Sequence, residues 1–341
     1  MLRPLRCAAF NDLHHGERSG KLSDRSRMQE NAVSLDLSVE LAPQHKPGLR
    51  LANPVMTASG TFGYGTEYSQ VFDIQKLGAI VCKGTTLHPR EGNPQPRLWE
   101  TASGVLNSIG LQNIGVAALI KEKAPVWASW RVPVIVNIAG DTVDDYARLA
   151  DKLDKVAGVS GIEVNISCPN VKAGGAAFGT NPEPAAEVTA AVRAATSLLV
   201  LVKLTPNTGD IVRVAQAVAA AGADAITLVN CLKGLAIDIA RRRPVLGNIT
   251  GGLSGPAIKP LALAMVYEVA GAVDLPVIGV GGITKAADAI EFIMAGASAV
   301  QIGSASFSNP RASLDVLEGI EQFLKKEGIQ KLSELIGAAR R

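Results

Sequence analysis

The strongest constraint on the fold is a unit that recurs from Asn53 to the end of the chain: a short apolar run, a polar or glycine-rich loop, then an Ala-rich stretch with helical periodicity. Apolar runs alternating with helices predict a parallel sheet buried on both faces. Eight such runs in 341 residues predict an α/β fold, a (β/α)8 TIM barrel. A doubly wound sheet is the alternative, but no Gly-x-Gly-x-x-Gly follows the first run.

The predicted elements are as follows. Strands are expected at Val55–Ala58, Ala79–Lys83, Val134–Asn137, Ile162–Asn165, Val200–Lys203, Ala225–Val229, Val277–Val280 and Ala299–Gly303. Helices are expected at Thr142–Val156, Pro182–Thr196, Gly209–Ala221, Ile258–Gly271, Lys285–Ala295 and Pro310–Glu327.

Three further segments lie outside this repeat. Alternating apolar residues in Ser34–Leu41, followed by Leu49–Leu51, predict a β-hairpin that plugs one end of the domain. The Gly/Pro-rich segment Arg90–Gly115 is too long for an ordinary loop, so we expect it to cover the barrel mouth. Residues 1–33 are polar and lack periodicity, which indicates a disordered extension or a start assigned too early, with Met28 as the alternative; acidic residues disfavour a targeting peptide. Residues 34–341 would then form the barrel domain.

Charge and cysteine usage exclude several classes of function. The net charge is +3 with no block of like charges, so nothing supports nucleic-acid binding. Four scattered cysteines without a Cys-x-x-Cys pair argue against a disulfide framework, a zinc site or an iron–sulfur cluster on this chain, and we expect no metal. No apolar run reaches the roughly 18 residues that span a bilayer, so we expect a cytoplasmic protein without membrane contact.

The predicted strand ends carry polar groups, and barrel active sites lie at the C-terminal ends of the strands. Gly281-Gly282 and Gly303-Ser304 end the last two strands, where loops of such barrels often bind phosphate through backbone N–H groups. Tight turns that need positive φ are the structural alternative.

Two lysines and several asparagines also stand at strand ends. Lys83 and Lys203 would be costly to bury without an anionic partner, such as the pyrimidine edge of a flavin or a substrate carboxylate. A Schiff-base lysine or a lysine at the rim remains open for each. Amides of Asn107, Asn165 and Asn230, with Asn170, suit a planar polar ring, although each alone fits a turn.

Cys168 follows the Ile162–Asn165 strand and precedes Pro169, which favours extended backbone at the cysteine. Gly174 and Gly175 then open a loop. A thiol flanked by amides at a strand end suits a catalytic edge, and a buried structural cysteine is the alternative.

Four motifs together resemble the dihydroorotate dehydrogenase family, most closely its class 1B catalytic subunits: Asn165–Asn170, Asn107–Asn113, Asn248–Pro256 and Gly279–Ile283. The resemblance runs from about Leu35 to the C-terminus. It implies an FMN-containing (β/α)8 barrel that oxidises (S)-dihydroorotate to orotate in pyrimidine (UMP) biosynthesis.

The resemblance also implies residue roles. Cys168 would remove the C5 proton, and hydride would pass from C6 to FMN N5. Expected FMN contacts are Ser59, Lys83, Gly84, Asn137, Asn165, Lys203, Val229, Gly255, Gly281, Gly282, Gly303 and Ser304. Expected substrate contacts are Lys83, Asn107, Ser108, Ile109, Gly110, Leu111, Asn165, Asn170, Asn230 and Cys231.

The class determines the expected partner. The membrane-associated class carries serine as its base and a hydrophobic N-terminal segment, and this chain has neither. Class 1B enzymes pair with a subunit that carries FAD and a 2Fe–2S cluster, form a heterotetramer around a homodimer of catalytic subunits, and pass electrons to NAD; class 1A enzymes use fumarate and work alone. Asn248–Pro256 and Lys172–Gly175 look more like 1B.

One residue departs from the family pattern, and three other functions stay open. Cys231 replaces the usual threonine, so a weaker donor faces the substrate. The alternatives are a pyrimidine reductase like that of dihydropyrimidine dehydrogenase, a flavin-free phosphate-binding lyase or aldolase, and a non-enzymatic phospho-ligand module.

Overall fold

The computed structural model describes residues 35–45, 48–166 and 178–340. The extension expected at residues 1–33 therefore lies outside the described residues.

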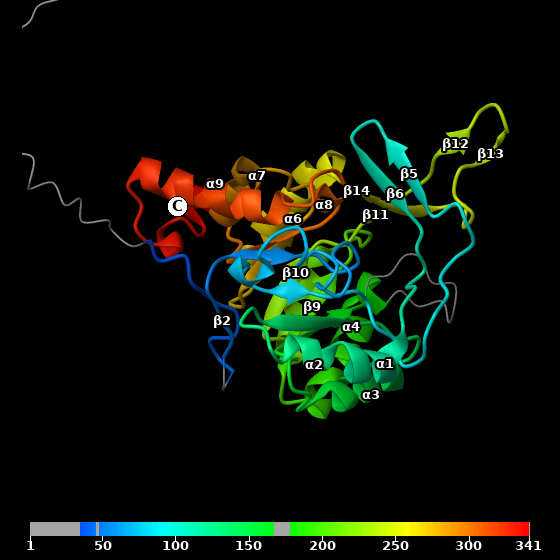
Figure 1. Cartoon of the computed structure of the whole chain (residues 1–341), viewed down its shortest axis with the longest axis horizontal. Coiled ribbons are helices and arrows are strands. Elements are labelled where there is room, and N and C mark those ends of the chain that lie inside the picture. Colours follow the sequence, from blue (N-terminus) through cyan, green and yellow to red (C-terminus); the bar gives the residue numbers. More distant parts are fainter. Residues whose placement is uncertain (1–34, 46–47, 167–177, 341) are drawn as a thin grey trace, which may run out of the picture. The chain divides into compact units, whose positions relative to one another are not determined.

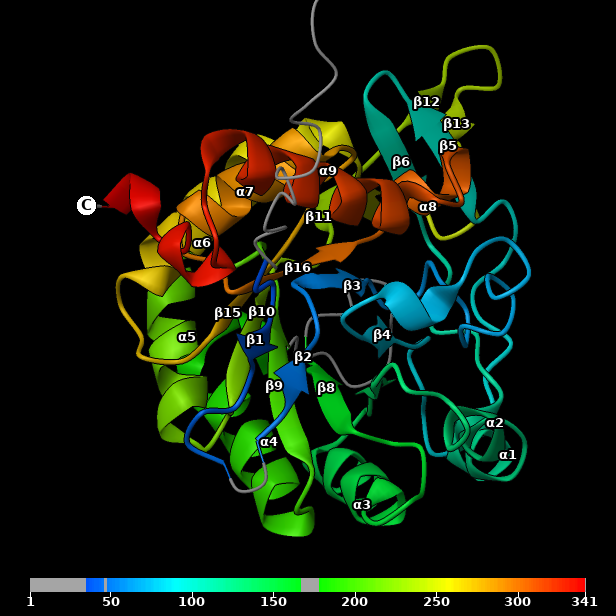
Figure 2. The same ribbon diagram turned by 60° about the vertical axis from the view of Figure 1, so that its left-hand side comes forward.

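Eight parallel strands form the barrel, and they correspond one for one to the eight predicted. In chain order they are β3 (Val55–Thr57), β4 (Ile80–Val81), β7 (Val134–Ile138), β8 (Gly161–Asn165), β9 (Leu199–Leu204), β10 (Ala225–Leu228), β15 (Val277–Val280) and β16 (Ala299–Ile302). Their spatial order is β3-β16-β15-β10-β9-β8-β7-β4. A parallel bridge between Met56 and Ala79 joins the two ends of this order. The predicted (β/α)8 barrel is therefore confirmed, and Figure 2 shows the strands with the helices packed around them.

The strands are continuous apolar runs because both of their faces are covered. All six residues of β9 are buried, and so are all five of β7 and β8. One large cluster of buried Val, Ile, Leu and Ala side chains fills the space between strands and helices. The core therefore has the aliphatic composition that favours a parallel sheet covered by helices.

The six predicted helices are present, and three more helices were not predicted. The former are α3 (Val143–Leu153), α4 (Pro182–Ala195), α5 (Ile211–Ala220), α6 (Lys259–Ala270), α7 (Ala286–Met294) and α9 (Ala312–Glu327); the latter are α1 (Gly115–Glu122), α2 (Ala124–Trp127) and α8 (Ala305–Ser308). Short 3-10 turns are η1 (Ile74–Lys76), η2 (Phe178–Thr180), η3 (Pro256–Ile258), η4 (Leu332–Glu334) and η5 (Ala338–Arg340).

Local signals fix several helix ends. Thr142 caps α3 by accepting from the N–H of Asp145, whose side chain accepts in return from the Thr142 backbone. Helix α9 ends at Gly328, which has φ 70°. Helices α1 and α2 lie next to each other in the chain and contain Gly115 and Pro125, which obscured their periodicity.

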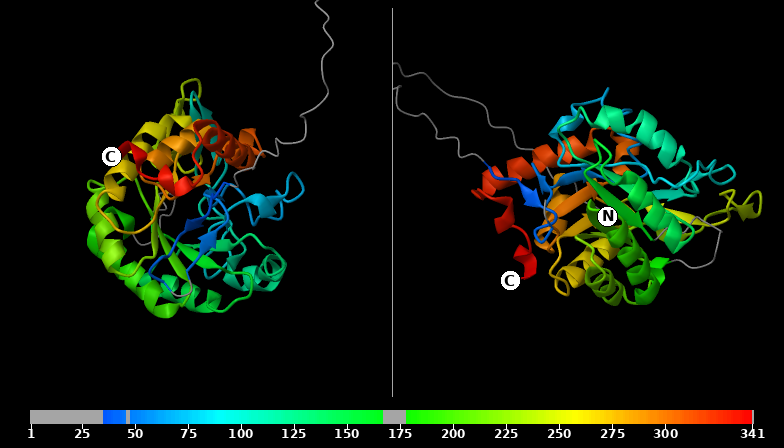
Figure 3. Two further views of the ribbon diagram at one scale, coloured as in Figure 1. Left: turned by 90° about the vertical axis from the view of Figure 1, so that its left-hand side faces the viewer. Right: turned by 90° about the horizontal axis from the view of Figure 1, so that it is seen from below.

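The predicted hairpin is present before the first barrel strand. Strands β1 (Val39–Glu40) and β2 (Arg50–Leu51) pair antiparallel, with Val39 opposite Leu51. The side chains of Leu41 and Leu51 are fully buried. Because β2 ends shortly before β3 begins, the hairpin lies at the amino-terminal end of the barrel, as Figure 3 also shows.

The segment Arg90–Gly115 supplies a hairpin at the opposite end. Its strands β5 (Leu98–Thr101) and β6 (Gly104–Asn107) join β11 (Leu232–Gly234) and β14 (Gly251–Ser254) in an antiparallel sheet of order β11-β14-β6-β5. A small hairpin, β12 (Ile237–Asp238) and β13 (Arg243–Pro244), projects beside it (Figure 1). The predicted mouth-covering segment is therefore confirmed, but it shares this role with an insertion after β10 that was not predicted.

Candidate active site

A cavity of about 720 Å³ opens at the carboxyl ends of the barrel strands, and the β5–β6 hairpin lines one side of it. Cofactor and ligand cavities commonly measure about 300–1,000 Å³. Every predicted cofactor-binding residue lines this cavity: Ser59, Lys83, Gly84, Asn137, Asn165, Lys203, Val229, Gly255, Gly281, Gly282, Gly303 and Ser304. The residues at strand ends and those implied only by the family resemblance, such as Gly255, thus lie around one cavity, although they range from Ser59 to Ser304 in the sequence.

The predicted substrate-binding residues are distributed less evenly. Most of them line the same cavity: Lys83, Asn107, Ile109, Gly110, Leu111, Asn165, Asn230 and Cys231. Ser108 differs, because its side chain is fully buried and does not line the cavity. Asn170 and the predicted base Cys168 lie outside the described residues.

The glycine-rich end of the cavity offers backbone donors. Gly281 and Gly282 have φ values of 133° and 72°, a region that favours glycine. In the described ranges, backbone N–H groups without a hydrogen-bond acceptor include those of Gly281, Gly282, Gly303 and Ser304. Several such donors at one end of a cavity suit an anion such as a phosphate.

An ion pair next to the glycine-rich end of the cavity was not predicted from the sequence. Lys259 Nζ lies 2.8 Å from Asp288 Oδ1 and 2.9 Å from Glu291 Oε1. The other oxygen of Asp288 accepts from the N–H and hydroxyl groups of Thr284. Burial alone would raise the pKa of Asp288, but the hydrogen bonds from Lys259 and Thr284 outweigh it and hold the pKa below its usual value. The spacing of Thr284 and Asp288 around a helix start is the signal that could have revealed this contact.

Lys203 of β9 lies at the bottom of the cavity, which we call the barrel floor, and has several polar partners. Its Nζ lies 3.2 Å from Gln301 Oε1, 3.4 Å from Ser59 Oγ and 3.7 Å from Glu163 Oε1. Glu163 is fully buried, with 0% exposure. The sequence predicted that a buried lysine would have an anionic partner, and for Lys203 that partner is Glu163 of the same chain. Glu163 and Gln301 were not predicted, although a charged or amide residue inside an apolar strand was a visible signal.

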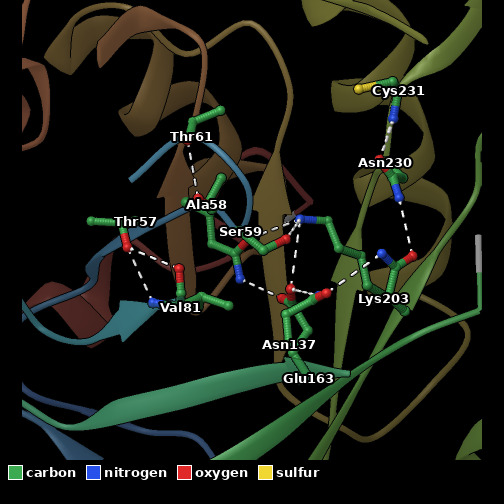
Figure 4. A network of polar contacts seen from close by, with 12 residues as sticks. Thr57, Ala58, Ser59, Thr61, Val81, Asn137, Glu163, Lys203, Asn230 and Cys231 are labelled. Atoms are coloured by element: carbon green, nitrogen blue, oxygen red, sulfur yellow. Dashed lines mark hydrogen bonds and ion pairs between the residues drawn. The ribbon is translucent and has the colours of Figure 1, made fainter. Parts of the chain in front are cut away.

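Three asparagines, which we call the asparagine chain, connect this floor to the substrate-binding side: Asn137, Asn165 and Asn230. Asn137 Nδ2 donates to Glu163 Oε1 over 2.7 Å. Asn165 Nδ2 donates to Asn137 Oδ1 over 3.5 Å, and Asn230 Nδ2 donates to Asn165 Oδ1 over 3.3 Å. Figure 4 shows these contacts as one network with Lys203 and Ser59.

The substrate-binding side holds two groups with shifted pKa values. Burial lowers the pKa of Lys83, with Glu67 opposing the effect. Burial raises the pKa of the Cys231 thiol, which keeps its proton at neutral pH. Asn107 Nδ2 lies 3.6 Å from Cys231 Sγ and donates to the Gly252 carbonyl over 3.2 Å. Asn107 and Cys231 thus come together from β6 and the start of the insertion after β10.

The cavity extends to the end of β8, two residues before the gap at 167–177 in the described ranges. Asn165 lines it at the end of β8. The Ile166 carbonyl accepts from the N–H of Gly179 over 2.9 Å. A backbone hydrogen bond therefore joins the two described ranges close to the ends that flank residues 167–177.

Two kinds of feature are absent from the described part of the chain. No group of three His, Cys, Asp or Glu side chains in those ranges is arranged to hold a metal ion. No helix there combines the length and the apolar character needed to cross a membrane.

Comparison with known proteins gave consistent matches. A family model described as dihydroorotate dehydrogenase matches residues 42–324. The chain is 58% identical over 302 residues to a protein from Trichlorobacter lovleyi named dihydroorotate dehydrogenase B (NAD(+)), catalytic subunit, covering 89% of this chain and 98% of the relative. A relative of the same name from Geotalea daltonii is 56% identical over 303 residues, which cover 89% of this chain and 98% of the relative. Another from Desulforamulus reducens is 54% identical over 307 residues, which cover 90% of this chain and 99% of the relative.

Proposed function

This chain belongs to the dihydroorotate dehydrogenase family, and from that premise we propose that it binds FMN and oxidises (S)-dihydroorotate to orotate in pyrimidine biosynthesis. The observation that carries the proposal is that one cavity, of about 720 Å³, brings three kinds of group together. It joins backbone donors at one end, Lys203 on its floor, and Lys83 with asparagine amides on the remaining side. We assign the FMN-binding domain to residues 34–341 and no part of the site to residues 1–33.

The donor set of the cavity fits FMN. The backbone N–H groups at Gly281, Gly282 and Ser304 suit the phosphate. Lys203 suits the pyrimidine edge of the ring, where a cation favours negative charge. When bound, FMN supplies the acceptor for the hydride that leaves substrate C6, at its N5 atom.

The substrate would lie between the FMN site and the β5–β6 hairpin. The Lys83 ammonium suits the carboxylate of dihydroorotate, because an ion pair at a partly buried site is strengthened by the reduced dielectric. Amides of Asn107, Asn165 and Asn230 offer donors and acceptors in fixed positions for the polar edges of the ring. Holding the ring in one pose contributes much of the rate in such reactions.

Cys168 is the proposed general base. Its thiolate removes the proton at C5 while hydride leaves C6, so that the C5–C6 single bond becomes a double bond. A free thiol has a pKa of about 8.5, so activity should rise toward alkaline pH unless the site lowers that value. Asn170 would contact the substrate close to this base.

We further propose that a partner subunit receives the electrons. The relatives named above are catalytic subunits of NAD(+)-linked enzymes. We propose that this partner contains FAD and a 2Fe–2S cluster and that the two subunits form a heterotetramer built on a homodimer of this chain. We also propose that the protein is cytoplasmic. Fumarate as the acceptor is the second candidate, and the Lys172–Gly175 and Asn248–Pro256 sequences favour NAD.

The experiment is a turnover assay. The purified chain, reconstituted with FMN, is mixed with dihydroorotate and an artificial electron acceptor, and orotate is measured by its ultraviolet absorbance. We expect orotate to form in proportion to bound FMN, and also with NAD once the partner is added. A flavin-loaded chain that forms no orotate with any acceptor would refute the proposal, and fumarate supporting turnover without a partner would refute the NAD assignment.

A further inference from the structure

The hydrogen bonds that link the three residues of the asparagine chain to one another run in one direction. The backbone N–H of Cys231 donates to Asn230 Oδ1 over 2.8 Å. From there each amide nitrogen donates to the next side chain: Asn230 to Asn165, Asn165 to Asn137, and Asn137 to Glu163 (Figure 4). The row begins on the substrate-binding side of the cavity and ends on the barrel floor.

The asparagine chain ends at Glu163, whose three polar neighbours are all potential donors. Glu163 Oε1 accepts from Asn137 Nδ2, and Oε2 accepts from Gln301 Nε2, each over 2.7 Å. The third neighbour, Lys203 Nζ, lies 3.7 Å from Oε1 and is also a donor. A protonated carboxyl would turn its O–H toward one of these donors, so the arrangement fits the carboxylate.

The other end of the row is a group that can only donate, because it is a backbone N–H. An acceptor-only group at one end and a donor-only group at the other require the same direction for every amide between them. A reversed asparagine would place donor against donor or acceptor against acceptor. Glu163 and the Cys231 N–H, one at each end, thus together fix whether each asparagine presents its carbonyl oxygen or its NH2 group at a given position.

Glu163 itself does not line the cavity. It lies two residues before Asn165 on β8, one layer deeper in the barrel, and faces Gln301 of β16. Gln301 Oε1 accepts in turn from Lys203 Nζ, so the same carboxylate also fixes the amide that supports the lysine.

We propose that Glu163 is a positioning residue: from beneath the cavity it supplies the acceptor that fixes one end of the asparagine chain and holds Lys203 in place, and both ligands bind well only when it does. The identity of these ligands, FMN and dihydroorotate or orotate, rests on the proposed function. The direction of the hydrogen bonds does not.

The variant Glu163→Gln tests this with little change in shape. A glutamine has one acceptor and one NH2 group, whereas the wild-type carboxylate faces amide donors from both Asn137 and Gln301. One of these two neighbours must therefore rotate. If Asn137 rotates, the asparagine chain is disrupted; if Gln301 rotates, Lys203 faces an NH2 group.

The double variant Glu163→Gln/Gln301→Glu is the matched rescue. The carboxylate placed at position 301 accepts from the new amide NH2 group and from Lys203, and the amide oxygen at position 163 accepts from Asn137. Charge, volume and donor–acceptor matching are all kept. If donor–acceptor matching is the reason for the role of Glu163, this exchange restores binding.

A control for simple loss of stability is Asp224→Asn. Asp224 precedes β10, at the opposite end of the barrel, and its side chain is 12% exposed. It accepts from Arg193 and from the N–H of Val200. This variant removes a partly buried, hydrogen-bonded carboxylate that does not line the cavity.

The measurement is the FMN dissociation constant of each apoprotein and the orotate dissociation constant of each FMN complex, alongside the melting temperature. We expect Glu163→Gln to weaken both at least about tenfold, equivalent to about 1.4 kcal/mol. The exchange variant should recover most of this, and Asp224→Asn should lose melting temperature only. Wild-type affinity in Glu163→Gln, or an exchange variant that binds as poorly as the single one, would overturn the proposal.

Two further outcomes are decisive. If Glu163→Gln does not fold, the exchange variant still decides, because it keeps every donor and acceptor matched: a folded, ligand-binding exchange variant supports the proposal and a non-binding one overturns it. A wild-type chain that takes up neither FMN nor orotate would refute the proposed function first, and this inference with it.

Discussion

Lys259 Nζ lies 2.8 Å from Asp288 Oδ1, and this ion pair stands directly behind the glycine-rich end of the cavity. A Cβ atom at Gly282 would come within 2.8 Å of Lys259 Cβ, so the loop and the lysine are closely packed. Asp288 also accepts from the N–H groups of Thr284 and Lys285. The pair therefore connects α6 and α7 through the loop that we assign to the FMN phosphate.

The first prediction concerns Asp288→Asn. Loss of the carboxylate leaves Lys259 with one partner and weakens the hold on Thr284, so we expect FMN to bind about tenfold more weakly, the size of one charge-assisted hydrogen bond. Glu291→Gln is the control, because Glu291 accepts from the same lysine over 2.9 Å but, within the described residues, forms no hydrogen bond with the loop backbone. FMN titration of the apoproteins measures both, and equal affinities in the two variants would contradict the phosphate-loop role.

The same variant carries a pH prediction for stability. Hydrogen bonds from Lys259 and Thr284 hold the pKa of Asp288 below its usual value, despite the opposing effect of burial. A depressed folded-state pKa stabilises the protein above the unfolded pKa of about 3.9, and this contribution is lost as the pH falls through the folded value. Urea unfolding should therefore separate wild type from Asp288→Asn at neutral pH, with the gap closing below about pH 4. A gap that persists in acid would show that the charge is not responsible.

A second prediction concerns Lys83. Burial lowers its pKa, with Glu67 opposing, so the ammonium is lost at a lower pH than in a free lysine. Because the substrate carboxylate needs the charged form, orotate affinity should fall as the pH rises through this lowered pKa. Lys83→Met should weaken orotate binding by about 10- to 100-fold and remove the pH dependence.

Orotate titrations in a Cys168→Ala background separate this effect from the thiol. Lys123→Met is the matched control, since Lys123 lies 5.2 Å from the centre of the Tyr64 ring and does not line the cavity. Unchanged alkaline weakening in Lys83→Met would exclude Lys83 as its origin.

A third prediction concerns the base. Cys168→Ala should keep FMN and bind orotate with near wild-type affinity, but it should slow flavin reduction by dihydroorotate by about 10²- to 10⁴-fold, the usual contribution of a general base. The alkaline rise in rate should disappear with the thiol. Stopped-flow absorbance checks both, with Cys7→Ala as the cysteine control outside the proposed domain. Fast reduction in Cys168→Ala would remove this residue from the mechanism.

A fourth prediction concerns Cys231. Burial raises the pKa of its thiol, so a weak neutral donor faces the cavity at neutral pH. A hydroxyl donates and accepts more strongly, and Cys231→Thr should tighten orotate binding by about 2- to 10-fold, the net value of one neutral hydrogen bond. Cys231→Val, with the same shape and no donor, should not. If the two variants bind orotate alike, position 231 does not donate to the ligand.

The barrel could be predicted from the sequence because its strands are buried on both faces and read as continuous apolar runs. The antiparallel sheet over the mouth could not. Its strands have only three or four residues, too few for a clear alternating pattern. Asn107 also pairs with Gly252, 145 positions away, so no local sequence pattern predicts this contact. Pairing at this range depends on the barrel that brings the two segments together.

The site likewise contains residues that could be predicted from the sequence and residues that could not. Strand ends and glycine pairs identified many of the residues that line the cavity, because chain topology places them there, and the family resemblance supplied others such as Gly255 and Ile109. The residues behind them were missed: Glu163 and Asp288 act through contacts with Lys203 and Lys259 that only the folded chain creates. Their signal in the sequence was small, namely one acidic residue inside an apolar strand and one at a helix start.

The most direct test of the central claim is anaerobic. One equivalent of dihydroorotate is added to the FMN-loaded chain in the absence of any acceptor, and the visible flavin band and orotate are followed together. The account predicts prompt bleaching of the band with one orotate formed per FMN. A flavin band that stays unchanged in a chain that binds orotate would contradict it.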